Sequence, residues 1–545
     1  MTLTETPPEE AAGPEAEAPP EPSEGRLTTA DHKRLGLSFL AGSLLFLLVG
    51  AALGMALRLE LVGEGVQVVG GNYGRTFSMH ATVSTLLFLA PAWVGLATYL
   101  VPLQIGSAGL AFPRLQAFAL WLFLLGGALL VTAYVVGPPA GLGLTTGTPI
   151  PPSRGGGTAA NSLWIVSAAL VSVAILLAAV NLATTVLTLR TEGLTLRRVP
   201  MFTWASLVTS LVTLLATPVF LAGLTMLYLD QHFGGPFFRP SNAGGQAVWQ
   251  HTLWLFGRPD VYLLLLPGLG AACDIVSTQA RRPLASLDLA RSAIVAFAVL
   301  SLGSWAAGSR VADALVLPTY TPLTALVVVP IGLLTLVWLA TAARGRPRLH
   351  PSLLFVAGFV GLLGFGALNA AVAGLVGVHG EAWATGHVHT VAFGAPTLLV
   401  FGAVYHWAPK LFGRHLSPKL GAASFLALFG GFFLMGLGSY LLGYDGAPFH
   451  VKDYPFTENG STFSPLAAVG GGLVLLGVLA AVADMVGTVR AGLGEKATDD
   501  PYEGLTLEWA TSSPPPPHNF DAVPEVRSAH PLLDLRAGAQ EPGDG

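Results

Sequence analysis

Long apolar runs dominate this chain, and their length is the feature that most limits how it can fold. Twelve runs reach the ~20 residues that a helix needs to cross a lipid bilayer. They lie near residues 35–57, 79–103, 115–137, 163–189, 201–228, 246–275, 291–309, 319–343, 353–377, 386–409, 420–443 and 465–489. Charged residues make up only 11% of the chain, whereas a soluble protein carries about 25%. The sequence therefore predicts an all-α integral membrane protein with a bundle of twelve transmembrane helices.

The two ends of the chain lack this apolar character. Residues 1–25 are rich in Pro, Glu and Ala, a composition that predicts a disordered acidic tail and differs from that of a signal peptide. Residues 26–491 hold all twelve runs and form the predicted membrane domain. Residues 492–545 are polar and contain SSPPPP at Ser512–Pro517. We expect them to form a cytoplasmic tail with an extended polyproline stretch on a surface.

The distribution of positive charge predicts the orientation in the membrane. If the N-terminus lies inside, 20 of the 27 Lys and Arg residues fall in inner segments and six in outer segments, and only Arg258 lies in the middle of a predicted span. This excess follows the positive-inside rule, so we expect both termini in the cytoplasm and the protein in a bacterial-type inner membrane. No basic patch indicates a nucleic-acid partner, and the single cysteine, Cys273, excludes disulfides and thiolate metal clusters.

Three histidines lie near the outer ends of predicted spans, at similar depth. His80 is in RTFSMHATVS, and His387 and His389 are in ATGHVHTVAFGAP. Two residues along an α-helix correspond to about 200° of rotation, so the latter two are expected on nearly opposite faces, each beside a different cofactor. Imidazole is the usual protein ligand of haem iron. Histidines in membrane helices also serve as simple hydrogen-bonding groups between helices, and the spacing alone leaves that alternative open.

Several longer motifs extend this interpretation. The chain contains, in this order, FSMHATV, QHTLWLFGRPDVYLLLLPG, HVHTVAFGAP and TLEWATSSPPPPHNF. Together they resemble the haem–copper oxidase superfamily, and within it the subunit I type of cytochrome c oxidase. The resemblance implies a twelve-helix bundle with two haems of a type that the sequence does not specify. It also implies that His80 and His389 bind a low-spin haem, that His387 binds a high-spin haem, and that Arg58 and Trp305 lie beside the haems.

The chain departs from the family at the copper site. The family holds a copper ion with three histidines, and the matching positions here are Arg258, Ala307 and Gly308. A guanidinium is a permanent cation without an acceptor lone pair, so it cannot replace an imidazole on copper. We therefore expect copper to be absent. Asp260 and Tyr262 keep an acid and a tyrosine that the family uses, which makes them, with Arg258, the candidate catalytic residues.

The charge of Arg258 has two open interpretations. A charge within a bilayer costs several kcal/mol and usually marks a functional site. Its cation can take over part of the electrostatic role of the missing copper, held by an anion such as a haem propionate. Alternatively, the second pocket has degenerated and the side chain extends outward to the membrane surface.

These departures shape the expected function. Gly109 and Leu334 stand where the family has an acid and a lysine of its proton pathways. We expect a subunit I-like membrane haem protein that transfers electrons within a respiratory complex and does not reduce oxygen in the ordinary way. The implied partners are subunit II- and III-like proteins, a cytochrome c or cupredoxin electron donor at the outer face, and the lipid bilayer.

Two other functions remain open from sequence, as does whether the chain is an enzyme. One is an active terminal oxidase, or a nitric oxide reductase-like enzyme, with a rebuilt metal site. The other is a haem-free twelve-span transporter.

Overall fold

The computed structural model describes residues 29–137, 159–238, 252, 260–303, 326–376, 381–448 and 459–538, except for the side chains of residues 260–263, 381 and 538. The predicted tail at residues 1–25 lies outside this part. The long helices are α1 (His32–Glu60), α4 (Pro113–Val136), α5 (Ala159–Thr188), α6 (Met201–Phe233), α8 (Asp260–Ala280), α9 (Leu287–Gly303), α11 (Val328–Arg344), α12 (Pro351–Val376), α15 (Pro418–Tyr444) and α16 (Gly460–Ala491). Two further spans are composite: α2 (Tyr73–Thr82), η2 (Val83–Leu89) and α3 (Ala90–Gln104), and α13 (Glu381–His387), η4 (Val388–Gly394) and α14 (Ala395–Phe412).

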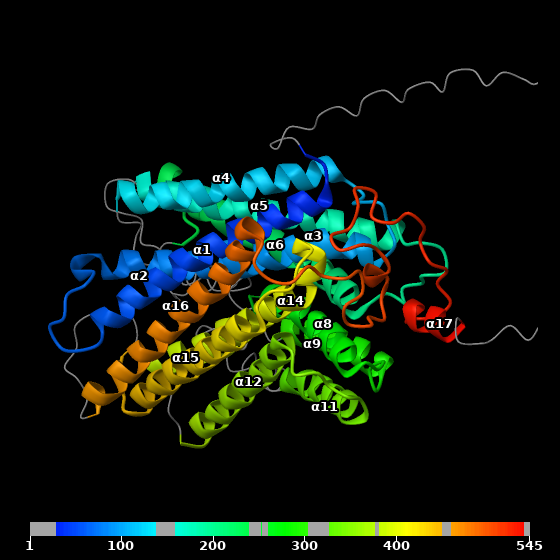
Figure 1. Ribbon diagram of the computed structural model, residues 1–545. Helices are drawn as coiled ribbons and strands as arrows, with labels where there is room; N and C mark the ends of the chain where they lie inside the picture. The colour runs from blue at the N-terminus through cyan, green and yellow to red at the C-terminus, as the bar shows by residue number, and fades with distance from the viewer. Residues whose placement is uncertain are drawn as a thin grey trace, which may run out of the picture.

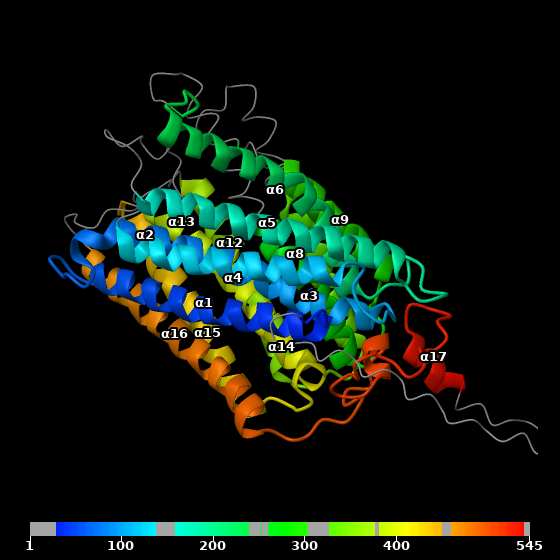
Figure 2. The same ribbon diagram turned by 90° about the horizontal axis from the view of Figure 1, so that it is seen from above.

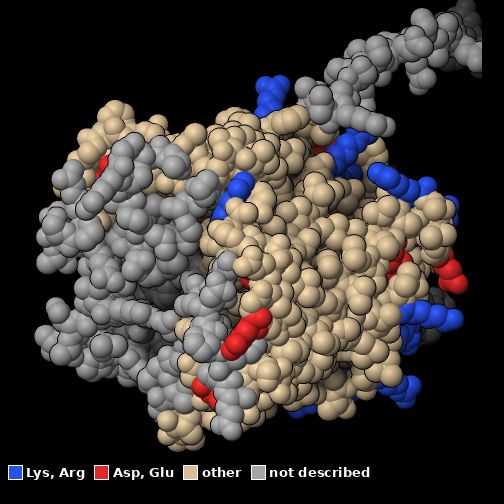
Figure 3. All heavy atoms as spheres, turned by 90° about the vertical axis from the view of Figure 1, so that its left-hand side faces the viewer, with Lys and Arg blue, Asp and Glu red and all other residues tan. Residues whose placement is uncertain are grey.

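Every predicted span overlaps one of these helices, although parts of the spans at 246–275, 291–309 and 319–343 lie outside the described residues. The helices lie side by side in one bundle (Figures 1 and 2). Within the described residues, nine continuous helical segments are long and apolar enough to cross a membrane, and α8 and α11 contribute shorter apolar helices. The all-α, multi-span fold that hydropathy predicted is confirmed. Seen from the end that holds the α1–α2 loop, most of the described surface is neither acidic nor basic (Figure 3).

The two composite spans occupy the centre of the bundle. Every residue of α14 from Ala395 to Leu411 is buried, and α3 is buried at all positions but Val94. A helix that is apolar on all sides is one that other helices surround. These two spans also carry His80, His387 and His389, each of them half-buried.

Both composite spans contain a π-helical segment next to the histidines. In one span η2 begins three residues after His80, and in the other α13 ends at His387 and η4 contains His389. The rotation of about 200° expected between His387 and His389 holds for an uninterrupted α-helix, whereas His389 lies in a wider, π-helical turn. Such π segments are uncommon and occur frequently at functional sites.

Glycine allows neighbouring helices to approach backbone to backbone. A Cβ atom on Gly431 of α15 would lie 2.8 Å from the carbonyl oxygen of Gly470 on α16, and one on Gly470 would lie 2.7 Å from that of Gly431. Small residues at crossing points are how membrane helices gain contact area without a hydrophobic driving force between them.

Residues 492–538 fold over one end of the bundle, which we call the capped end (Figure 1). They include η5 (Leu507–Ala510) and α17 (Pro531–Gly538). Asn519 is buried there; its Oδ1 accepts a hydrogen bond from Lys33 Nζ at 2.9 Å, and its Nδ2 donates to Ser107 O at 2.8 Å. The expected surface stretch at Ser512–Pro517 has no helix or strand, but it belongs to a packed cap.

Candidate functional site

His80 of α2 and His389 of η4 lie next to one another, both of them half-buried. Their ring centroids are 6.0 Å apart and their planes are inclined by 13°. An imidazole binds a metal at about 2 Å from nitrogen, so two axial imidazoles on one iron place their ring centroids about 6 Å apart. The pair therefore has the separation that bis-histidine coordination of a haem iron requires.

The outer nitrogen of each ring is fixed by a backbone carbonyl. His80 Nδ1 lies 2.8 Å from Gly50 O, and His389 Nδ1 lies 2.8 Å from Thr385 O. A carbonyl can only accept, so each Nδ1 carries the proton and each Nε2 keeps its lone pair. Metal-binding histidines are held in this way by their second nitrogen. The donor set thus fits haem iron in tautomer as well as in spacing.

Helix α1 presents one face to this pair through Gly50, Gly54 and Arg58. Residues four apart share a helix face, and the chain places a glycine at the two positions nearest the imidazole. A Cβ atom on Gly54 would lie only 2.7 Å from His80 Cε1. Arg58 continues the same face and donates from Nη1 to Ser439 Oγ of α15 at 3.2 Å. The structure thus places Arg58 on the α1 face next to the histidine pair.

His387 has different neighbours. Its Nδ1 lies 3.4 Å from the hydroxyl of Tyr440 on α15, and its ring stacks on Trp383 with centroids 5.1 Å apart and planes inclined by 12°. The structure therefore brings His80 and His389 together and directs the Nδ1 side of His387 toward α15. Two histidines of one span, two residues apart, therefore reach separate environments.

The side chains of the remaining predicted site residues lie outside the described part of the chain. Arg258, Trp305, Ala307 and Gly308 are not described. Asp260 and Tyr262 belong to the first turn of α8, but their side chains are not described. The predicted loss of copper and the role of Arg258 thus stay predictions from sequence.

A buried acidic pair at the capped end was not predicted from the sequence. Asp274 of α8 accepts hydrogen bonds from Met201 N at 3.1 Å and Phe202 N at 3.0 Å, at the start of α6. Gln104 Nε2 bridges Asp274 Oδ2, at 3.3 Å, and Glu508 Oε1, at 3.0 Å. An acid inside the apolar run AACDIV was a signal for Asp274. Glu508 gave none, because it lies in a polar tail.

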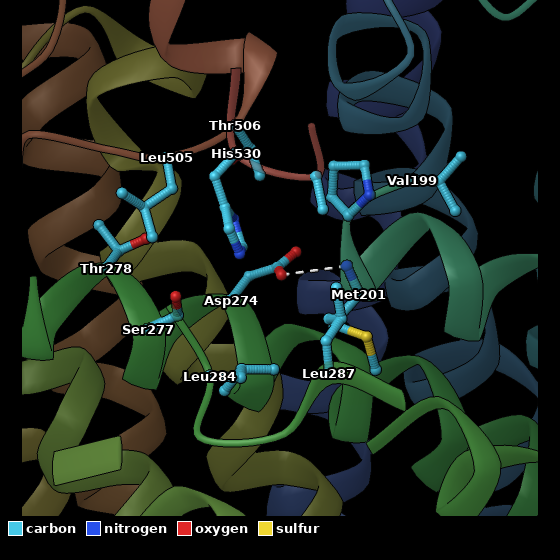
Figure 4. A pocket seen from close by; sticks show the side chains of 12 residues that line it. Val199, Met201, Asp274, Ser277, Thr278, Leu284, Leu287, Leu505, Thr506 and His530 are labelled. Atoms are coloured by element: carbon cyan, nitrogen blue, oxygen red, sulfur yellow. Dashed lines mark hydrogen bonds between the residues drawn. The ribbon is translucent and has the colours of Figure 1, made fainter. Parts of the chain in front are cut away.

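A small cavity lies beside Asp274 (Figure 4). Asp274, Ser277 and Thr278 line it from α8, and Thr506 and His530 line it from the C-terminal segment. Its volume of about 20 Å³ has room for about one water molecule. The Nδ1 atom of His530 has no hydrogen-bond partner among the described residues, and burial lowers the pKa of this imidazole. The cavity can hold a bridging water and is too small for an organic substrate.

Comparison with known proteins gives consistent matches. The family model for cytochrome c and quinol oxidase polypeptide I matches residues 34–473. A putative cytochrome c oxidase subunit 1-beta of Streptomyces avermitilis is 35% identical over 517 residues, covering 93% of this chain and 91% of that protein. Cytochrome c oxidase subunit 1 of Corynebacterium efficiens is 33% identical over 517 residues, covering 93% and 89%. A cryo-EM structure of a heme-copper terminal oxidase dimer matches with a TM-score of 0.70 and 17% identity, over 86% of this chain and 85% of that one. This last likeness concerns the fold.

Proposed function

Because the chain belongs to the cytochrome c oxidase subunit I family of the haem–copper oxidases, we propose that it is an electron-transferring haem subunit of a respiratory complex that lacks the copper site. His80 and His389 hold a low-spin haem, and His387 holds a second, high-spin haem. When bound, these groups supply one-electron redox chemistry, and the second supplies an open coordination position for a small ligand.

The observation that carries this proposal is the relation between His80 and His389. Their centroid separation of 6.0 Å fits one iron between them. Carbonyl partners on both Nδ1 atoms favour the tautomer that binds metal through Nε2. A pair of histidines that merely joined two helices would need neither of these features.

The copper part of the proposal rests on residue chemistry. None of Arg258, Ala307 and Gly308 has a side-chain lone pair for a metal. Without a second metal beside the high-spin haem, the four-electron reduction of oxygen loses the centre that the family uses for it. The protein then passes electrons or binds a small gas or anion at the second haem, and does not act as an ordinary oxygen reductase.

Arg258 supplies a fixed positive charge in the second pocket. A cation at the position of a copper ligand stabilises an anion there, either a haem propionate or a bound small ligand. Its side chain thereby takes over part of the electrostatic role of the metal. The same charge disfavours the entry of a copper ion.

The location and the partners that we propose are those of the family. The protein spans a bacterial-type inner membrane with both termini in the cytoplasm, and residues 26–491 form the haem-binding membrane domain. Subunit II- and III-like partners complete the complex. A cytochrome c or cupredoxin delivers electrons at the outer face, near the end of the bundle that holds the three histidines.

The test is an absorption spectrum of the purified protein, reduced minus oxidised, with and without carbon monoxide, together with metal analysis. We expect two haems per chain and no copper. One haem should ignore carbon monoxide because both its axial positions are filled, and the other should bind it.

Three results would each contradict a different part of the proposal. Copper at half the haem content would restore an active oxidase with a rebuilt metal site. Two haems that both ignore the gas would exclude the open coordination position at His387. Protein without a Soret band would point to the haem-free transporter.

A further inference from the structure

The three candidate iron ligands differ in what holds their second nitrogen. Backbone carbonyls hold His80 and His389, each at 2.8 Å, whereas the Nδ1 of His387 faces the Tyr440 hydroxyl at 3.4 Å. We propose that Tyr440 is a positioning residue that orients the His387 imidazole and sets the strength of its bond to the second haem. This inference rests on the proposed function, since it takes His387 to be an iron ligand.

The packing between α13 and α15 leaves Tyr440 little freedom to move. A Cβ atom on Gly386 would lie 3.0 Å from Tyr440 Cδ1 and 3.1 Å from the carbonyl oxygen of Gly436. One turn further along α15, a Cβ on Gly443 would lie 2.4 Å from Trp383 N. Glycines on both helices thus bring the two backbones close together on either side of the tyrosine. Tyr440 is 0% exposed, so its hydroxyl is held in the interior at a fixed place beside the imidazole.

Trp383 fixes the imidazole from a second direction. It precedes His387 by one helical turn and stacks on it with a centroid distance of 5.1 Å. The indole covers one face of the imidazole, and the phenol stands at its Nδ1 edge. Together they determine the direction in which Nε2 points.

A phenol and a carbonyl form different hydrogen bonds with the second nitrogen of a metal-binding imidazole. A carbonyl only accepts, but a tyrosine hydroxyl both donates and accepts. When His387 binds iron through Nε2, its Nδ1 carries the proton and donates to the Tyr440 oxygen. At 3.4 Å this is a long contact with a neutral acceptor. Through this long contact the His387 imidazole donates less electron density to the iron than it would through a short hydrogen bond. Loss of the contact would reduce that electron donation further.

The test replaces Tyr440 by Phe, which keeps the ring that packs on Gly386 and removes only the hydroxyl. The matched control is Tyr444→Phe, one turn further along α15, where the hydroxyl donates to Asn369 O at 3.0 Å. Both variants are purified as full chains with their haems. The haem content, the iron–histidine stretching frequency of the reduced protein and the midpoint potential of the carbon monoxide-binding haem are then measured.

We expect Tyr440→Phe to lower the iron–histidine frequency and to raise the midpoint potential of the second haem only. The second haem should also be retained about 10-fold less tightly, as is found when the partner of a metal ligand is removed. Tyr444→Phe should leave all three values at those of the unmodified protein. Unchanged frequency and potential in Tyr440→Phe would overturn this inference and leave the proposed function intact. Unmodified protein without a carbon monoxide-binding haem would overturn both.

A measurement on the unmodified sequence covers the case in which Tyr440→Phe does not assemble. Photolysis of bound carbon monoxide changes the iron–histidine bond, and its infrared difference spectrum should then contain a tyrosine band. Ring-deuterated tyrosine should shift this band, and Tyr444→Phe should retain it. A difference spectrum without a tyrosine band would overturn the inference.

Discussion

Gly54 of α1 lies directly against the imidazole of His80, so that a Cβ atom there would be 2.7 Å from His80 Cε1 and 3.1 Å from its Nδ1. This contact explains why α1 has no side chain at that position. The ring occupies the space that a side chain would take, and the carbonyl of Gly50, one turn earlier, holds its Nδ1.

Gly54→Ala should therefore disturb the low-spin haem. The methyl group forces the imidazole of His80 away from His389, and bis-histidine coordination needs one nitrogen of each ring at about 2 Å from the same iron. We expect the visible spectrum to lose its six-coordinate low-spin component and a carbon monoxide-binding fraction to appear there.

The matched control for Gly54→Ala is Gly430→Ala on α15. A Cβ atom on Gly430 meets nothing within 4 Å, so the change should leave the spectrum unaltered and shift stability by no more than about 1 kcal/mol. A normal low-spin spectrum in Gly54→Ala would contradict the predicted role of His80.

Single histidine replacements should separate the two haems. His80→Ala and His389→Ala should each remove the low-spin signal, and His387→Ala should keep that signal while abolishing the response to carbon monoxide. His232→Ala is the control, because its Nε2 contacts Ser162 Oγ at 2.8 Å and it has no predicted role at a haem. The absorption spectrum and the haem content of these four variants test the prediction. Loss of both haems from His387→Ala alone would contradict the separate assignment.

Hydropathy was sufficient to predict the spans, because a membrane forces nearly every backbone hydrogen bond to be formed within a helix. The local interruptions were not predictable in this way. The π-helical segments η2 and η4 depend on how neighbouring helices pack, and their sequences, VSTLLFL and VHTVAFG, are as apolar as ordinary helical turns.

The candidate site was also predictable only in part. Sequence placed His80, His387 and His389 at one level and separated the environments of the last two. Their partners could not be predicted, because Gly50 O, Thr385 O and the Tyr440 hydroxyl come close only through the local and tertiary fold. The acid at Glu508 was hidden for a related reason, since a polar segment becomes buried only when it folds onto the bundle.

The predicted absence of copper can be tested by restoring the ligands. The triple variant Arg258→His, Ala307→His, Gly308→His supplies three imidazoles with lone pairs for a metal. We expect it to bind close to one copper per two haems after purification in copper-supplemented medium. Arg258→His alone should bind little, because a single imidazole does not hold a copper ion. The ratio of copper to haem is measured by elemental analysis, and copper in the unmodified protein would contradict the prediction.

The buried acid at the capped end should make stability depend on pH. Burial raises the pKa of Glu508 above its ordinary value, although hydrogen bonds from Gln104 and Trp407 to its carboxylate oppose this rise. A raised pKa in the folded state means that the folded protein binds a proton that the unfolded chain has lost. This contribution to stability is complete below the unfolded value of about 4.3 and is lost as pH rises through the folded value. Glu508→Gln mimics the neutral acid. The variant should therefore lose less stability than the unmodified protein as pH rises.

The measurement for Glu508 is the thermal unfolding midpoint of the detergent-solubilised protein from pH 4 upward, together with the rate at which a protease removes residues 492–538. The control is Glu525→Gln, whose carboxylate lies on the surface and pairs with Arg527 at 2.7 Å. Its pKa is lowered by that pairing, so its contribution has the opposite sign and is weakened by exposure to solvent. If Glu508→Gln and the unmodified protein lose stability in parallel as pH rises, then Glu508 does not hold the proton and another buried acid of the capped end must account for the slope.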